Sequence, residues 1–134
     1  MPKQYRTRNG TIASANTKTA ISEQGSISSP GTLYVPDGAR ELESVIVAAC
    51  ADFAAAGHAA VFVRLEGSGL PSGPETLLVC AMGGNSTTGV QGRMAAKKIP
   101  LHVPVTPGND ILIYGEMAGD DLGNVELGVT LVFT

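Results

Sequence analysis

The chain has 134 residues, of which 43% are hydrophobic and 16% are charged. This length suits one domain that buries roughly two-thirds of the surface of its unfolded chain, so the fold requires neither a metal nor a disulfide. No apolar run approaches the roughly 18 residues of a membrane helix, and the N-terminus lacks the apolar segment of a signal peptide. We therefore expect neither membrane insertion nor Sec-type export.

The charge is distributed unevenly along the chain. Lys3, Arg6, Arg8 and Lys18 are the only charged side chains in residues 1–18, which carry +4. The totals of 9 basic and 12 acidic residues leave 5 basic and 12 acidic residues, a net charge of −7, for residues 19–134. The pattern indicates a basic N-terminal segment attached to an acidic body.

Taken in chain order, the polar residues 1–25 predict an extended basic N-terminal arm, and SSPG at 28–31 predicts a turn. Short apolar runs then recur between Gly- and Pro-rich turns over residues 26–134. They lie at 32–35, 43–50, 59–67, 76–82, 98–105, 110–117 and 125–133. Runs of this length and spacing are typical of strands in an all-β protein. The sequence therefore predicts one antiparallel, jelly-roll-like β-sandwich domain over 26–134.

One segment, residues 39–56, is also compatible with a helix. Ala is frequent in this segment, and helical spacing is followed by Leu42, Val45, Ile46, Ala49, Cys50 and Phe53. The β-branched cluster at 45–47 and the β-like character of the rest of the chain favour a strand instead. We predict a strand here, with a loop at 51–58.

The prolines and the C-terminal pattern predict where two strands lie in the sheets. Pro100 and Pro104 cannot donate ladder hydrogen bonds, so the strand at 98–105 is expected at an edge or with a bulge. The last run, VELGVTLVF, alternates strongly between apolar and other residues and contains no proline. It is expected to be a central strand.

Residues that carry chemistry are sparse. No G-x-S-x-G, P-loop or H-E-x-x-H motif occurs, and the two histidines, His58 and His102, are far apart in the sequence. Asp120, Asp121 and Asn124 supply oxygen atoms for a weak Ca²⁺ site, but they lack the spacing of a dedicated calcium loop, so a turn is favoured. We expect no enzymatic activity and no cofactor.

The four basic residues Lys3, Arg6, Arg8 and Lys18 have two possible uses. They could contact nucleic-acid phosphates weakly, or they could bind an acidic neighbouring subunit. With only one aromatic residue among them, assembly is the favoured role of this arm.

The layout also resembles a known group of proteins. A short arm, an all-β body and the segments VRLEGSGLPSGPETLLV, IPLHVPVTPGNDILIYGEM and VELGVTLVF are similar to small single-jelly-roll capsid or head-decoration proteins of bacterial or archaeal viruses. The resemblance implies a non-enzymatic virion protein, made in the host cytoplasm, that assembles as a trimer or larger ring with itself and with other capsid proteins. It also implies Arg64, Glu66 and the 83–96 loop as interface elements.

Two other classes remain open at this stage. The first is a trimeric β-sandwich binding module or surface adhesin, which a stacking aromatic patch would favour. The second is an enzyme or metal-binding barrel, which would require a convergent polar cluster.

Overall fold

The computed structural model describes residues 2–21, 33–51, 57–71, 77–86, 95–120 and 124–134, with the backbone alone for 50–51, 57–59, 77–86 and 95–96. Nine strands lie in these ranges. They are β1 (Gln4–Ile12), β2 (Thr19–Ala20), β3 (Leu33–Tyr34), β4 (Glu41–Ala51), β5 (Gly57–Glu66), β6 (Leu77–Ser86), β7 (Ala95–Pro104), β8 (Asp110–Gly119) and β9 (Val125–Phe133). No helix able to span a membrane occurs in the described ranges.

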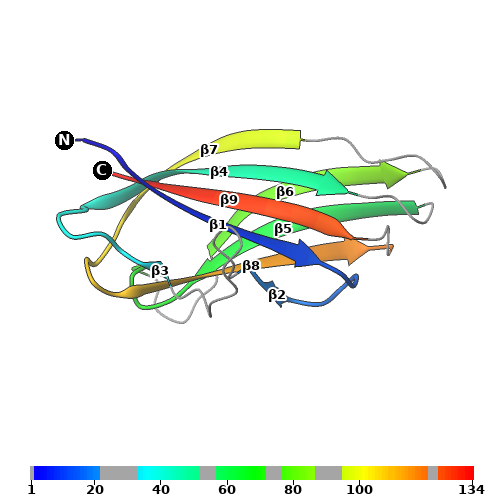
Figure 1. The fold of residues 1–134 in the computed structure, drawn as a ribbon, viewed down its shortest axis with the longest axis horizontal. Coiled ribbons are helices and arrows are strands. Elements are labelled where there is room, and N and C mark those ends of the chain that lie inside the picture. Colours follow the sequence, from blue (N-terminus) through cyan, green and yellow to red (C-terminus); the bar gives the residue numbers. More distant parts are fainter. Residues whose placement is uncertain (1, 22–32, 52–56, 72–76, 87–94, 121–123) are drawn as a thin grey trace.

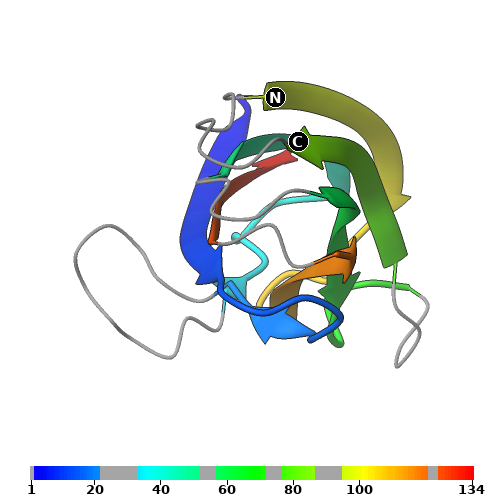
Figure 2. The same cartoon turned by 90° about the vertical axis from the view of Figure 1, so that its right-hand side faces the viewer.

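The strands form two antiparallel sheets that enclose a common interior (Figures 1 and 2). One sheet has the order β1-β9-β4-β7, and the other has the order β2-β8-β5-β6 with β3 paired to β8. The predicted all-β antiparallel sandwich is therefore confirmed.

The core forms because strands from both sheets alternate apolar and other residues. In β9 the odd-numbered side chains from Val125 to Phe133 are buried, and in β8 Ile111, Ile113 and Met117 are buried. Burying a Val, Leu or Phe side chain stabilises the fold by roughly 1.5–3 kcal/mol relative to leaving it in water. These residues meet Val45 and Val47 of β4 and Val63 and Leu65 of β5 in one cluster.

The segment that is compatible with either helix or strand is strand β4 over Glu41–Ala51. Val45, Val47 and Ala49 are buried while Ile46 and Ala48 are half-buried, which is the two-residue period of a strand. The predicted strand is confirmed. The predicted loop at 51–58 is wrong for Ala51, which ends β4, and for Gly57 and His58, which begin β5, while residues 52–56 lie outside the described residues.

Both predictions about strand position are confirmed. β9 pairs with β1 on one side and with β4 on the other, so it is central. β7 lies at the end of its sheet and pairs with β4 alone among the described strands. It is also bulged, because its register with β4 shifts between Leu42 and Ser44, and His102 in this region has a φ of 54°.

The division of the chain into an arm and a body is wrong for residues 4–12. These residues form β1, which pairs with β9 over its whole length, and Ile12 and Ile21 are buried in the core. The polar sequence of residues 4–11 gave no sign of a strand. The side chains at these positions are half-buried or exposed, and such an edge strand needs few apolar residues. Residues 22–25 of the predicted arm lie outside the described residues.

Candidate functional site

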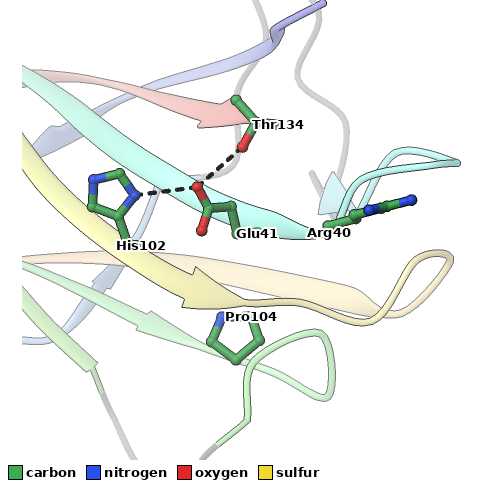
Figure 3. Close-up of a pocket in the computed structure, with 5 residues that line it drawn as sticks. All are labelled: Arg40, Glu41, His102, Pro104 and Thr134. Carbon is green, nitrogen blue, oxygen red and sulfur yellow. Dashed lines mark hydrogen bonds and ion pairs between the residues drawn. The ribbon is translucent and has the colours of Figure 1, made fainter. Parts of the chain in front are cut away.

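A small open pocket lies at one end of the four-stranded sheet (Figure 3). Its volume is about 360 Å³, and its lining comes from the start of β4, the end of β7 and the residue after β9: Arg40, Glu41, His102, Pro104 and Thr134. The backbone of Thr134 fixes this end of the sheet, because its N–H donates to Glu41 O (3.1 Å) and its carbonyl oxygen accepts from the N–H groups of Arg40 (2.7 Å) and Glu41 (3.1 Å).

The side chain of Glu41 is the centre of the polar contacts in this pocket. Its Oε1 accepts a hydrogen bond from Thr134 Oγ1 at 3.2 Å and lies 3.1 Å from His102 Nδ1. The His102 side chain is 62% exposed, so water screens its pairing with Glu41, and such a pair adds at most about 1 kcal/mol. The Thr134 hydroxyl contacts the carboxylate and not the imidazole, so these three groups do not make the nucleophile–base contact of a catalytic triad.

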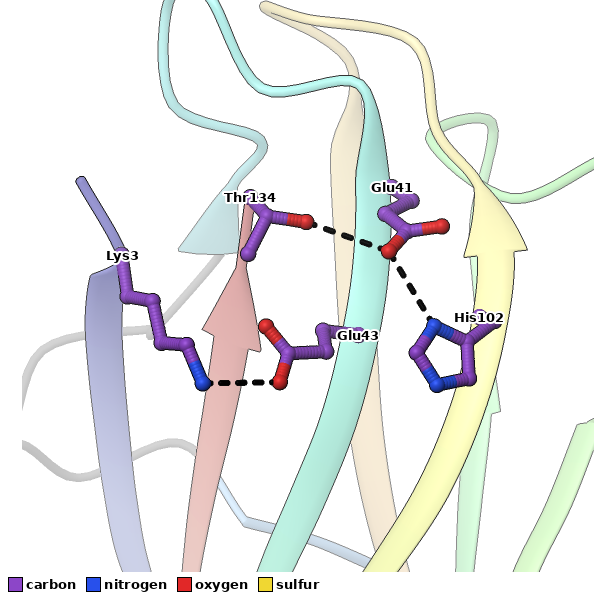
Figure 4. Close-up of polar contacts among 5 residues, drawn as sticks. All are labelled: Lys3, Glu41, Glu43, His102 and Thr134. Carbon is purple, nitrogen blue, oxygen red and sulfur yellow. Dashed lines mark hydrogen bonds and ion pairs between the residues drawn. The ribbon is translucent and has the colours of Figure 1, made fainter. Parts of the chain in front are cut away.

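A second ion pair lies beside this cluster (Figure 4). Lys3, just before β1, reaches across the end of β9 so that its Nζ lies 2.9 Å from Glu43 Oε1 on β4. This hydrogen bond lowers the pKa of Glu43, and the same contact raises the pKa of Lys3. The pair joins β1 to β4 on the outer face of the sheet.

The four basic residues of the predicted arm do not form a single patch. Lys3 pairs with Glu43, whereas Lys18 pairs with Glu66 at 2.7 Å on the other sheet, where its Nζ also lies 4.1 Å from the centre of the Tyr114 ring. Two of the four charges are thus balanced within the chain. Their use in assembly stays a prediction.

Arg6 and Arg8 have a different environment on β1. They lie opposite Leu131 and Val129 of β9, on the side of the sheet that faces the core, and both are half-buried. Each guanidinium Nη1 donates to a backbone carbonyl at 2.9 Å, Arg6 to Tyr5 and Arg8 to Thr7. Arg8 Nε is buried without a hydrogen-bond partner, and burial, followed by the nearby charge of Arg6, lowers the pKa of Arg8. Neither arginine forms an ion pair with any described acidic residue.

The candidate Ca²⁺ ligands lie around the connection from β8 to β9. Asp120 follows β8 and Asn124 precedes β9 at an exposed position, while Asp121 lies outside the described residues. The described part of the chain contains no group of three His, Cys, Asp or Glu side chains placed to hold a metal. The favoured turn and the weak Ca²⁺ alternative both stay untested, because residues 121–123 lie outside the described ranges.

Two of the interface elements implied by the viral resemblance, Arg64 and Glu66, lie on the outer face of the second sheet. Arg64 Nη2 is 3.9 Å from Glu116 Oε2, and Glu66 pairs with Lys18. Of the 83–96 loop, residues 83–86 belong to β6 and 95–96 to β7, while residues 87–94 lie outside the described ranges. Their role at an interface also stays a prediction.

The sequence analysis missed the cluster around Glu41. Glu41 is 61 residues from His102 and 93 residues from Thr134, so no local motif could reveal their contact. The pairing of β4 with both β7 and β9 brings them together.

Comparisons with known proteins assign no family. No protein-family model and no curated protein matches the chain. Among solved structures, a pilus protein of Bacillus endospore appendages is 13% identical with a TM-score of 0.38, and the match covers 98% of this chain and 88% of that one. A protein of the infectious bursal disease virus particle is 15% identical with a TM-score of 0.46. A family 22 carbohydrate-binding module of Clostridium thermocellum Xyn10B is 14% identical with the same TM-score, and the match covers 98% of this chain and 85% of the module.

The viral match covers 98% of this chain but only 31% of the viral one. One of these three structures comes from a virus particle, and none comes from a virus of bacteria or archaea. All three TM-scores are below 0.5, so these matches do not establish a function for the chain.

Proposed function

We propose that this chain is a non-enzymatic structural subunit that associates with copies of itself through the outer face of the sheet β1-β9-β4-β7. The observation that carries this proposal is an uncharged patch across three neighbouring strands. The cross-strand register places its members in two rows: Thr7, Thr130 and Ile46 in one, and Asn9, Gly128 and Ala48 in the other. We call these six residues the central face.

Side-chain contacts hold part of the central face in place, which favours contact between proteins. Thr7 Oγ1 and Thr130 Oγ1 lie 2.9 Å apart in a side-chain hydrogen bond, and Asn9 Oδ1 lies close over Gly128. Short side chains held in this way lose little conformational freedom on association. Tyr5, which is 56% exposed, stands beside the face and adds a large apolar contact surface.

Charges on this side of the sheet lie around the central face. Lys3 and Glu43 pair at one end, Glu126 is exposed at the other, and Lys98 lies on the edge strand β7 beside Ile46. An apolar or neutral centre with a charged rim is the usual anatomy of a protein interface. This arrangement supports self-association through the face.

The finer role that we propose is that of a capsid or capsid-decoration protein of a virion. In that role the chain would form a trimer or larger ring and contact other capsid proteins. Strong nucleic-acid binding is not part of the proposal, because Lys3 and Lys18 already pair with carboxylates.

The alternative, a trimeric binding module or adhesin, is less well supported. Its ligand would need a face with unpaired polar or aromatic groups. On the outer face of the second sheet, Lys18 covers the Tyr114 ring and pairs with Glu66, and Arg64 lies near Glu116. Lys18, Tyr114 and Glu66 are thus already engaged with one another.

The proposal is tested by light scattering and electron microscopy at micromolar concentration, comparing two variants. Thr130→Asp places a carboxylate in the central face and should weaken association by roughly tenfold or more, because the charge must be desolvated at the interface. Thr106→Asp makes the same change in an exposed turn and should leave association unchanged. A wild-type protein that stays a 13.7 kDa monomer would overturn the proposal.

A further inference from the structure

Among the described strands β1 pairs with β9 alone, so one side of its backbone has no described strand partner. The hydrogen bonds at Thr134 show which residues of β1 face that side. Both backbone groups of Thr134 bond to Glu41 of β4, so the even-numbered residues of β9 face β4 and the odd-numbered ones face β1. The register pairs Leu131 with Arg6 and Val129 with Arg8, so the even-numbered residues of β1 bond to β9. Tyr5, Thr7, Asn9 and Thr11 therefore direct their N–H and C=O groups away from β9, toward the open edge.

The close contact between Thr7 and Thr130 supports this assignment independently. Directly opposite residues approach most closely in the pairs that do not exchange backbone hydrogen bonds. The two hydroxyl oxygens are 2.9 Å apart, as expected for such a pair. Thr7 thus directs its backbone N–H and C=O groups away from β9, toward the open edge.

The two arginines of β1 cover part of this edge. Arg6 and Arg8 donate to the carbonyls of Tyr5 and Thr7, which are the outward-facing carbonyls that an incoming strand would use. These two hydrogen bonds come from side chains at the edge of the sheet. The N–H groups of an incoming strand can therefore replace the guanidinium groups without disturbing the ladder between β1 and β9.

A second β1 is a poor occupant of this edge. Two-fold pairing of β1 with its copy brings the arginines of one copy close to those of the other, and like charges across a strand pair are destabilising. The edge strand β7 is equally unsuitable because it carries Lys97, Lys98 and two prolines. The arginines, which have no described acidic partner, instead fit a strand that carries carboxylates.

We propose that the open edge of β1 binds, by strand addition, an extended segment of a partner protein with carboxylates at alternate positions. On binding, Arg6 and Arg8 release the carbonyls of Tyr5 and Thr7 to the N–H groups of the incoming strand and pair with its carboxylates. Residues two apart in a strand are separated by roughly 6.5–7 Å, so two alternate carboxylates match the spacing of the two arginines. Arg–carboxylate pairs can form two parallel hydrogen bonds, which favours acidic strands over neutral ones. This edge is a different surface from the central face.

The test uses two blocked nine-residue peptides, TVTETETVT and TVTQTQTVT, with the intact protein. The glutamate peptide should bind roughly tenfold tighter or more in calorimetry and should shift the backbone NMR signals of Tyr5, Thr7, Asn9 and Thr11. The preference should disappear in Arg6→Gln/Arg8→Gln and persist in Lys97→Gln/Lys98→Gln, which removes the same charge from the opposite edge.

Equal affinity for the two peptides, absence of binding, or shifts confined to other strands would each overturn the proposal. The two peptides are compared on the wild-type protein, so the result does not depend on the folding of any variant. Thr130→Asp separates this site from self-association, because it should weaken association through the central face and leave the peptide preference intact.

Discussion

The two edges of the sheet β1-β9-β4-β7 are protected in different ways. β7 has Pro100 and Pro104, a bulge near His102 and exposed lysines at 97 and 98. Its backbone and its charges therefore both oppose pairing with another strand. β1 pairs with β9 in an unbroken register of nine residues and contains no proline. In the described part of the chain, the side chains of Arg6 and Arg8 bond to the carbonyls on its open side. One edge is closed permanently, and the other is closed by bonds that a suitable strand can replace.

The largest expected effect concerns β9, the strand between β1 and β4. Leu131→Asp should abolish folding, because it buries an unpaired carboxylate in the core at a cost of several kcal/mol. Thr130→Asp, on the outer face, should keep the fold. Circular dichroism of both variants checks this, and equal tolerance of the two changes would mean that the inward and outward faces are wrongly assigned.

A pair of proline variants tests the direction of the β1 backbone. Arg8→Pro removes an N–H that bonds to β9 and should lower the free energy of unfolding by about 1–3 kcal/mol, because a carbonyl in the ladder loses its donor. Thr7→Pro removes an N–H that faces the open edge and should lower the free energy of unfolding clearly less than Arg8→Pro. Urea denaturation compares the two variants, and a greater loss for Thr7→Pro would reverse the assignment.

Removing the groups that protect the β7 edge should change aggregation more than the free energy of unfolding. Pro100→Thr combined with Lys98→Thr removes a proline and a charge from this edge while leaving the core unchanged. We expect a change in unfolding free energy of less than about 1 kcal/mol and a faster rise of light scattering at high concentration. Arg6→Gln/Arg8→Gln should increase aggregation at the β1 edge similarly. Unchanged scattering in both variants would show that neither edge governs association.

The smallest effect is expected at the ion pair between Lys3 and Glu43, because the Lys3 side chain is 44% exposed and water screens the pair. The pKa of Glu43 is lowered in the folded protein, so its contribution to stability is present above the unfolded pKa of a glutamate and is lost as the pH falls through the folded pKa. Glu43→Gln should therefore lower the melting temperature slightly at pH 7 and not at pH 2. A larger difference in melting temperature between the variant and the wild type at pH 2 than at pH 7 would contradict this predicted pH dependence.

The sequence predicted those parts of the fold that depend on alternation of apolar residues. The central position of β9 and the edge position of β7 followed from the strong alternation of VELGVTLVF and from Pro100 and Pro104. β1 was not predicted as a strand because its inward positions hold Gln4, Arg6 and Arg8, which give no apolar period. Long-range register brought Glu41 beside His102, and no local pattern carries that information.

Amide hydrogen exchange along β1 in the free protein is the most direct test of the open edge. The account predicts an alternating pattern, with slow exchange at Arg6, Arg8 and Ile12, whose N–H groups bond to β9, and fast exchange at Tyr5, Thr7, Asn9 and Thr11. Uniformly slow exchange at all these positions would contradict it, because the outward side of β1 would then already be bonded to another part of the molecule or to a copy of it.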